Sequence, residues 1–302
     1  MSTSNRKDCY TEITTAILAD LENGIRPWVK PWETGVGTPC RPLRNTGEPY
    51  RGINVLWLWS VAARNGYRSP YWLTYKQARD LGAHVRKGEK SSRVVYASLY
   101  RKTEDDDARE PEEKRIPFLK AYSVFNAEQI EKIPERFAAK NSPVGRIPLD
   151  IPGAERVREF FRNTRAQFRT DQEQAYYSVL EDTIYSPPLS AFPNPDRFYS
   201  TLAHELTHWT GHPSRLPRKF PRAGVGLSNY AREELIAELG AAFLCADLGV
   251  NLTPRPDHTD YIGHWLQVLR NDKRAIFHAA AVAQQATDYL HAAQPEALNR
   301  AA

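Results

Sequence analysis

Hydrophobic residues recur along this chain with two different spacings, which predict helices and strands in separate regions. Apolar positions three and four residues apart, the period of an amphipathic helix, occur over residues 8–24, 55–65, 155–170, 261–269 and 275–290. Apolar and polar positions alternate over residues 94–100 and 117–125, as in half-buried strands, and residues 175–185 are also strand-like. With a further short helix expected over 71–81, the pattern predicts a mixed α+β fold.

A proline-rich stretch divides the chain into two parts. Four prolines fall within residues 132–152, a composition typical of a linker. We therefore expect a small α/β domain over residues 1–130, a linker over 131–152, and a mostly helical domain with a short sheet over 153–302. The charged segment 104–115 is expected to form a long loop between two strands of the first domain.

The two parts also differ in charge. The chain of 302 residues has a formal net charge of +5. Residues 1–102 hold 17 Lys and Arg against 8 Asp and Glu, a balance of +9, whereas the remaining 200 residues hold 24 against 28, a balance of −4. Five of the 7 tryptophans also lie in the basic part. A basic, aromatic-rich domain beside a mildly acidic one favours an anionic polymer as the partner of the first domain.

The composition also argues against some classes of protein. Hydrophobic residues make up 41% and charged residues 25% of the chain, as in an ordinary globular protein. No apolar run approaches the roughly 20 residues that a membrane-spanning helix needs, and residues 1–8 lack the apolar core of a secretion signal. Cys9, Cys40 and Cys245 have no paired spacing and are interpreted as reduced thiols. We expect a cytoplasmic protein with no membrane partner.

The motif H-E-L-T-H at residues 204–208 is the clearest candidate for chemistry. Its segment is predicted to form a buried helix that ends near Gly211. Histidines four residues apart lie on one face of a helix, so His204 and His208 could hold one metal ion. Glu205 follows the first histidine directly and is placed to act as the general base toward a metal-bound water. Zn²⁺ is the metal that this motif favours, with Mn²⁺ and Co²⁺ as alternatives.

A catalytic zinc site usually has three protein ligands, and a second predicted helix offers the third. Glu234 and Glu238 are four residues apart and share a helix face. We take Glu234 as the ligand and Glu238 as the residue that accepts the second ring N–H of a ligating histidine, and the reverse assignment remains open. His212, just past the end of the first helix, is the other candidate ligand. Tyr230 or His258 is a candidate donor to an oxyanion.

The basic part has the residue types that bind single-stranded nucleic acid. Lysine and arginine neutralise phosphates, and aromatic rings stack on unpaired bases whatever their sequence. The sequence shows no recognition-helix motif for duplex DNA. The candidate contacts cluster around a glycine-tipped basic loop and its neighbours, and they are Arg51, Tyr71, Trp72, Lys76, Arg86, Lys87, Lys90 and Arg93.

Several longer motifs resemble those of ArdC-type antirestriction proteins, a family carried on conjugative plasmids. In the basic part they are R-N-T-G-E-P-Y-R-G-I-N at residues 44–54, W-L-T-Y-K-Q-A at 72–78 and G-A-H-V-R-K-G-E-K at 82–90. In the second part they are H-E-L-T-H-W-T-G-H-P-S-R-L at 204–216 and E-E-L-I-A-E-L-G-A-A-F-L at 233–244. The resemblance extends over nearly the whole chain.

This resemblance implies an N-terminal domain that binds single-stranded DNA, related to that of TraC-type plasmid primases, and a C-terminal zincin-like metallopeptidase domain. It also implies that the protein shields incoming plasmid DNA from host restriction endonucleases. The second motif is similar to N-E-x-x-S-D of the gluzincins, which places the ligand at Glu234. This chain departs from that pattern at Glu233, Ala237 and Glu238.

Three functions remain compatible with these features. DNA binding could be the whole function, with a metal site that is structural or idle. The chain could instead be a DNA-stimulated metalloprotease that cleaves a host defence protein. In the third alternative it is a plain zinc peptidase that acts on a peptide or protein, and the basic part only anchors it.

Overall fold

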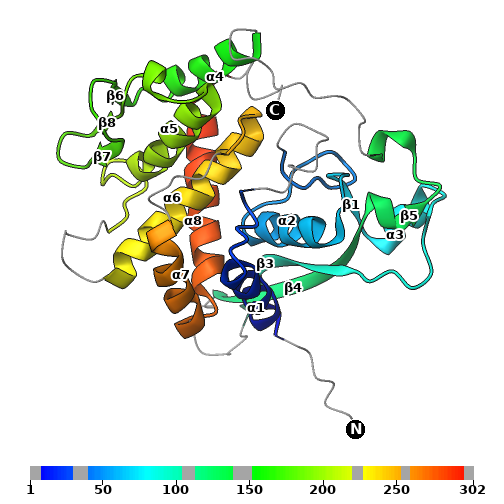
Figure 1. The fold of residues 1–302 in the computed structure, drawn as a ribbon. Helices are drawn as coiled ribbons and strands as arrows, with labels where there is room; N and C mark the ends of the chain where they lie inside the picture. The colour runs from blue at the N-terminus through cyan, green and yellow to red at the C-terminus, as the bar shows by residue number, and fades with distance from the viewer. Residues whose placement is uncertain are drawn as a thin grey trace.

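The computed structural model describes residues 8–29, 40–103, 113–138, 152–219, 227–252 and 259–295. The N-terminal part begins with helices α1 (Cys9–Glu22) and α2 (Ile53–Asn65). Strands β1 (Trp72–Leu73), β3 (Ser92–Thr103) and β4 (Glu113–Asn126) form an antiparallel sheet in the order β1-β4-β3. Helix α3 (Tyr75–Asp80) lies beside a small second sheet of β2 (His84–Val85) and β5 (Ile130–Glu131) (Figure 1).

The C-terminal part is mostly helical. It contains α4 (Pro152–Asn163), α5 (Pro195–Thr210), α6 (Leu227–Leu248), α7 (Thr259–Asn271) and α8 (Ala275–Ala292). Helix α6 packs against α5, α7 and α8 and is the centre of this part (Figure 1). A short sheet of β6 (Gln167–Arg169), β8 (Thr183–Tyr185) and β7 (Tyr176–Ser178), in that order, lies beside α5. The mixed α+β class expected from the sequence is confirmed.

Three expected elements differ from the structure. The short helix expected over residues 71–81 is helical only over Tyr75–Asp80, because Trp72 and Leu73 pair with β4 as strand β1. The single strand-like segment over residues 175–185 is a hairpin of β7 and β8, turned through Asp182 at a φ of 48°. The helix expected over 155–170 ends at Asn163, and the chain continues as β6, parallel to β8. Short strands of three residues give too little alternation for a pattern to separate them from a turn or a helix end. The loop expected over 104–115 lies mostly outside the described residues.

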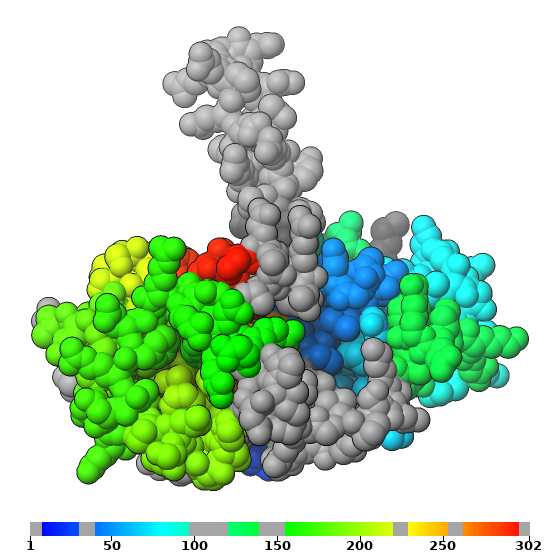
Figure 2. Space-filling model, turned by 90° about the horizontal axis from the view of Figure 1, so that it is seen from above, coloured from blue at the N-terminus to red at the C-terminus, as the bar shows by residue number. Residues whose placement is uncertain are grey.

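The two parts share one hydrophobic core. Seen from above, they lie side by side, the N-terminal part in blue, cyan and blue-green and the helical part in green to red (Figure 2). A single cluster of buried side chains runs from α1 and α2 into α5, α6, α7 and α8. Trp28 meets the edge of Trp265 at 6.1 Å between ring centroids, and Trp59 lies 6.2 Å from Phe243. The tryptophans of the basic part therefore join the two parts together.

A second, smaller core extends the N-terminal part beyond the expected boundary at residue 130. Phe137, in the short helix η2 (Glu135–Phe137), is 1% exposed and packs with Leu73, Ala78 and Ile130. Residues 131–138, expected to begin the linker, thus belong to this packed region. The rest of the expected linker, up to residue 151, lies outside the described residues.

Candidate metal centre and nucleic-acid surface

The histidine motif lies in the last turns of helix α5. The side chain of Asn194 accepts a hydrogen bond from the backbone N–H of Arg197 and caps the helix, and Pro195 is the first helical residue. The helix is buried on nearly all sides from Phe198 to Thr210. As expected, it ends at Gly211. Residues 204 and 208 thus lie one turn apart, and their rings are 4.9 Å apart between centroids.

Helix α6 approaches α5 closely where the two candidate motifs meet. Gly240 lies against Thr207, which is the residue just before His208. A Cβ atom at position 240 would come within 2.4 Å of the Thr207 side chain, so only glycine allows this approach. The close approach brings the glutamates of α6 to the histidines of α5.

Two histidines and one glutamate converge at this crossing. Nε2 of His204 lies 3.4 Å from Oε2 of Glu234, and Nε2 of His208 lies 3.4 Å from Oε1 of the same carboxylate. One donor atom from each of the three residues lies within 4.8 Å of the others. The three residues are 3%, 8% and 8% exposed. Their donors form a compact set with the chemistry of a divalent-metal site.

Glu233, which in the sequence is only a departure from the gluzincin motif, contacts one of these histidines. Its Oε1 lies 3.1 Å from Nδ1 of His208, on the side of the ring away from Glu234. Arg218 donates to the Glu233 carboxylate from Nη2 at 2.9 Å and from Nε at 3.1 Å. The same guanidinium donates to the backbone carbonyl of Thr207 at 2.6 Å. His208 is therefore oriented by a glutamate that an arginine fixes to the end of α5.

Glu238 lies on the corresponding side of the other histidine. Its Oε2 is 3.9 Å from Nδ1 of His204, an ion-pair distance rather than a hydrogen bond. Its Oε1 accepts a hydrogen bond from Nε1 of Trp28 at 3.2 Å and lies 3.6 Å from Nη1 of Arg26. Both of these residues come from the N-terminal part. Glu238 thus lies on the Nδ1 side of His204 without a hydrogen bond to it, so its expected role as acceptor of the ring N–H stays a prediction. Its contacts with the N-terminal part were not foreseen.

Burial and the neighbouring carboxylates give the two histidines different pKa values. Burial lowers the pKa of His204, although Glu234 and Glu205 oppose this effect. Burial also lowers the pKa of His208, but the contacts with Glu233 and Glu234 outweigh it and raise the pKa to about 10. Burial raises the pKa of Glu234, whereas its contacts with both histidines hold that pKa well below its usual range. The two carboxylates beside His208 thus favour its protonated form.

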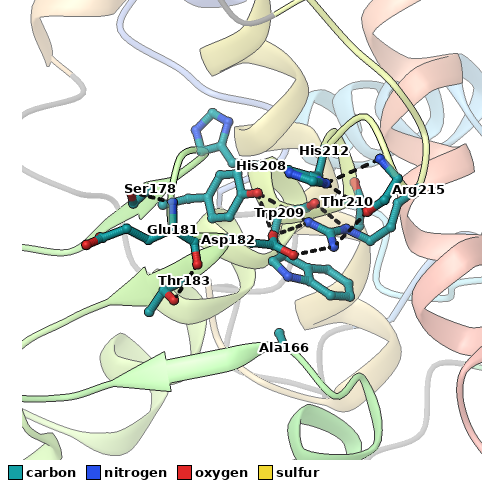
Figure 3. A network of polar contacts seen from close by, with 12 residues as sticks. Ala166, Ser178, Glu181, Asp182, Thr183, His208, Trp209, Thr210, His212 and Arg215 are labelled. Carbon is teal, nitrogen blue, oxygen red and sulfur yellow. Dashed lines mark hydrogen bonds and ion pairs between the residues drawn. The ribbon is translucent and has the colours of Figure 1, made fainter.

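A polar network fixes the segment that follows α5. Arg215 donates from Nη1 to Asp182 at 2.8 Å and from Nε to the backbone carbonyl of Trp209 at 2.8 Å. Its guanidinium carbon lies 3.8 Å from the centroid of the Trp209 ring (Figure 3). The same segment continues to Arg218. Arg215 thus joins the β7–β8 turn to the end of α5. This contact also fixes the segment on which Arg218 lies, and Arg218 contacts Glu233.

The other residues expected near this centre have different surroundings. Glu205 is 3% exposed and lies close enough to His204 to affect its pKa. His212 lies past the helix end, with its ring nitrogen Nδ1 2.8 Å from the hydroxyl of Ser214, and it is not part of the donor cluster. Tyr230 is 40% exposed on α6. His258 lies outside the described residues.

The six basic residues among the expected DNA contacts divide into two groups. Lys76 on α3 and Arg86, Lys87 and Lys90 in the loop between β2 and β3 are exposed, and α3 packs beside β2. The guanidinium of Arg86 is engaged by Glu89 of the same loop at 2.6 Å. This group forms an exposed basic surface.

The other two arginines are paired within the protein. Arg51 forms an ion pair with Asp288 of α8, and Arg93 forms one with Glu12 of α1. Their charges join elements of the fold, so they contribute less to the exposed basic surface than the sequence suggested.

The expectation that Trp72 is a stacking platform is wrong. Its side chain is 1% exposed and lies in the core against the edge of Tyr67, because β1 is covered on both sides. Tyr71 is half-buried, with its ring against the edge of Phe137. Among the residues of this part whose burial is described, the exposed rings are instead Tyr75, Tyr96 and Tyr122, at 54%, 58% and 43%. Strand alternation could have indicated the last two, since they lie on the β3–β4 hairpin.

Among the described residues, no helix combines the length and the apolar character needed to cross a membrane.

Comparison with known families first identifies the class of the helical part. A family model described as a zincin-like metallopeptidase matches residues 155–282, which include His204, His208 and Glu234 as well as the neighbouring Glu233 and Glu238. A second model, the N-terminal domain of anti-restriction factor ArdC, matches residues 7–125. The chain therefore combines a zincin-like metallopeptidase domain with an N-terminal domain of an antirestriction factor, which points to an interaction with DNA.

Solved structures and relatives agree with both matches. The metal-free structure of the antirestriction protein ArdC from plasmid R388 is 46% identical, with a TM-score of 0.79 over 95% of this chain and 97% of that one. The Mn(II)-bound structure of that protein is 43% identical, with a TM-score of 0.78 over 95% and 98%. This chain belongs to the ArdC antirestriction family. The expected family and two-domain fold are thereby confirmed.

Two relatives place the family in a wider context. The protein y4eC of Sinorhizobium fredii is 36% identical over 304 residues, 96% of this chain and 94% of the relative. The DNA primase TraC of Escherichia coli is 33% identical over 305 residues, which are 94% of this chain but 27% of TraC. Nearly the whole chain thus corresponds to about a quarter of that primase. Together with the Mn(II)-bound structure, the family and the donor cluster indicate a site for a divalent metal.

Proposed function

We propose that this chain protects incoming plasmid DNA in the cytoplasm by binding it as a single strand through the N-terminal part. The observation that carries the proposal is the exposed surface of that part. Lys76, Lys87 and Lys90 are exposed on neighbouring elements, where they can neutralise phosphates. Tyr75, Tyr96 and Tyr122 offer exposed rings on which unpaired bases can stack. Lys120 lies 5.5 Å from the Tyr122 ring centroid and adds a cation beside it.

We further propose that His204, His208 and Glu234 hold the metal, and that this metal is Zn²⁺. Three donors bound at about 2.1 Å around a tetrahedral ion lie roughly 3.4 Å apart. Each Glu234 oxygen lies 3.4 Å from the Nε2 atom of a different histidine, and one donor atom from each residue lies within 4.8 Å of the others, so a modest side-chain movement would close the set around one ion. Glu233 and Glu238, on the Nδ1 sides of the two rings, support ligation through Nε2.

In this arrangement the protein residues have distinct chemical tasks. A bound divalent cation supplies Lewis acidity to a water or to a peptide carbonyl. Glu205, buried beside His204, accepts a proton on its carboxylate and can deliver it to a leaving amine. Glu233 and Arg218 keep the His208 ring in place while this happens. The outer edge of β7, which pairs only with β8 among the described strands, is available to an extended peptide.

A restriction-protection assay tests the DNA part of the proposal. Full-length protein is first mixed with single-stranded plasmid DNA. The complementary strand is then annealed, and a restriction endonuclease is added. Replacement of Lys87 and Lys90 by Glu should abolish protection. The matched control replaces Arg156 and Arg162 by Glu, which makes the same change of charge at two exposed positions of α4 in the C-terminal part and should retain protection. Equal protection by the Lys87 and Lys90 variant and the unchanged protein would contradict the proposal.

A second candidate function is a DNA-stimulated metalloprotease that cleaves a host defence protein. The zincin-like match and the compact donor cluster favour it. The Glu205→Gln variant separates the two functions, because it keeps the proposed ligands but removes the proton acceptor. Protection that survives this substitution, with an intact endonuclease in the same reaction, supports DNA binding alone. Endonuclease fragments that appear only with Glu205 present support proteolysis.

A further inference from the structure

We propose that Trp28 and Arg26, from the N-terminal part, are positioning residues of the metal site. They hold Glu238 behind His204 and thereby make metal affinity depend on the contact between the two parts of the chain. This inference rests on the metal site proposed above.

The contacts form a continuous path from one part to the other. Nε1 of Trp28 donates to Oε1 of Glu238 at 3.2 Å, and Oε2 of the same carboxylate lies 3.9 Å from Nδ1 of His204. The opposite nitrogen of that ring, Nε2, lies 3.4 Å from Oε2 of Glu234. One oxygen of Glu238 is thus held by the N-terminal part, and the other faces a proposed ligand.

Burial keeps water away from the contact between Trp28 and Glu238. Trp28 is 0% and Glu238 is 3% exposed, so water cannot replace the indole N–H at the carboxylate without opening the interface. Arg26 adds a cation 3.6 Å from the same Oε1, with its side chain 14% exposed. A buried carboxylate needs such partners to stay charged. A carboxylate held in place can in turn orient the histidine ring for ligation.

The chain path explains why these two residues reach the site. Helix α1 is followed by Gly24, whose φ of 72° lets the chain turn sharply at the helix end. The segment then lies against the helical part, where Trp28 packs on the edge of Trp265. Trp265 itself donates to the backbone carbonyl of Ala231 in α6 at 3.0 Å. The turn carrying Trp28 is therefore fixed to the helix that carries both Glu234 and Glu238.

Titration of full-length protein with Co²⁺ in competition with a chelator tests this inference. The Trp28→Phe variant keeps a ring in the interface but removes the N–H, and we expect metal binding about 10-fold weaker. Arg26→Gln should also weaken it, with a changed visible spectrum of the bound Co²⁺ in both variants. The matched control is Trp59→Phe, which alters another buried tryptophan of the interface whose Nε1 donates to the Cys40 carbonyl. This control should bind Co²⁺ as the unchanged protein does.

A double variant distinguishes positioning from general loosening. If Trp28 acts through Glu238, the double variant Trp28→Phe/Glu238→Gln binds Co²⁺ no more weakly than Glu238→Gln alone. Equal losses in Trp28→Phe and Trp59→Phe, or fully additive losses with Glu238→Gln, would overturn the inference. Should Trp28→Phe not fold, unchanged Co²⁺ affinity in Arg26→Gln would overturn it as well. An unchanged protein that binds no Co²⁺ would instead overturn the proposed metal site itself.

Discussion

Gly240 of α6 lies so close to Thr207 of α5 that a Cβ atom added to it would be 2.4 Å from Cγ2 and 2.6 Å from Oγ1 of that threonine. Thr207 cannot easily turn away, because its hydroxyl donates to the Ala203 carbonyl at 2.8 Å within the same helix. The close crossing of the two helices therefore depends on the absence of a side chain at position 240. The distance between Glu234 and the two histidines depends on it as well.

Gly240→Ala should therefore destabilise the protein by about 1–3 kcal/mol, as overpacking in a core does. Thermal unfolding measures this loss of stability, and the affinity for the metal should fall in parallel. Thr207→Ala in the same chain should restore most of the loss, since it removes both clashing atoms. The control is Gly263→Ala on α7, where an added Cβ meets nothing within 4 Å and should stabilise the helix by roughly 0.5–1 kcal/mol. A Gly240→Ala protein as stable as the unchanged one would contradict this account of the crossing.

Glu233→Gln should weaken metal binding about 10- to 100-fold, the usual effect of removing a partner behind a ligating histidine. The amide is too weak an acceptor to keep the His208 ring oriented, and it also loses the charge that Arg218 pairs with. Chelator competition measures the dissociation constant. Glu173→Gln, at an exposed position, is the control and should leave it unchanged. Equal affinities in both variants would show that Glu233 has no part in the site.

Metal binding should become tighter as pH rises. The pKa of His208 is raised to about 10 in the metal-free protein, so near neutral pH this histidine must lose a proton before it can ligate. Between roughly pH 6.5 and 8.5, affinity should rise about tenfold per pH unit, with one proton released per metal ion. Calorimetry in buffers of different ionisation enthalpy measures the number of protons released per metal ion. A flat profile would contradict a protonated His208, and Glu233→Gln should reduce the slope because it removes a cause of the raised pKa.

The same raised pKa has a consequence for folding stability. A histidine whose pKa is higher in the folded than in the unfolded state stabilises the fold fully below the unfolded value, about 6.5, and loses that contribution as pH rises through the folded value. The metal-free protein should therefore lose stability between neutral pH and pH about 10, the folded pKa of His208. Chemical denaturation across this range measures the loss, and His208→Gln should make it smaller.

The exposed tyrosines of the β3–β4 hairpin should contribute to DNA binding. Tyr96→Ala and Tyr122→Ala should each weaken binding to a single-stranded oligonucleotide by about 1–3 kcal/mol, the value of one stacked base. Fluorescence anisotropy at fixed salt measures the affinity. Tyr176→Ala is the matched control, because this tyrosine is 44% exposed but lies on the C-terminal part. Losses no larger than in this control would show that bases do not stack on the hairpin.

Local patterns predicted much of this fold. The helices α1, α2, α5, α6, α7 and α8 and the two long strands follow from apolar spacing, because their apolar residues are buried in a large core. The short strands β1 and β6 escaped prediction, and β7 and β8 were not separated, because two or three residues contain too little pattern. The hydrophobic core shared by the two parts was not predicted either. A sequence pattern can indicate that a tryptophan is buried, but it does not say which part of the chain covers it. For this reason a chain cut near residue 130 would expose core residues and is a poor test of the separate parts.

The sequence by itself determined the family and the residues that can hold a metal, because histidines four apart on a helix must share a face. It also determined the basic character of the N-terminal part. Only the tertiary structure decided that Glu233 and Arg218 support His208, and that Trp28 and Arg26 reach Glu238 from the other part of the chain. It likewise decided that Trp72 is core while Tyr96 and Tyr122 are exposed. Such contacts join residues far apart in sequence, and their partners depend on how helices and turns pack, which no local spacing specifies.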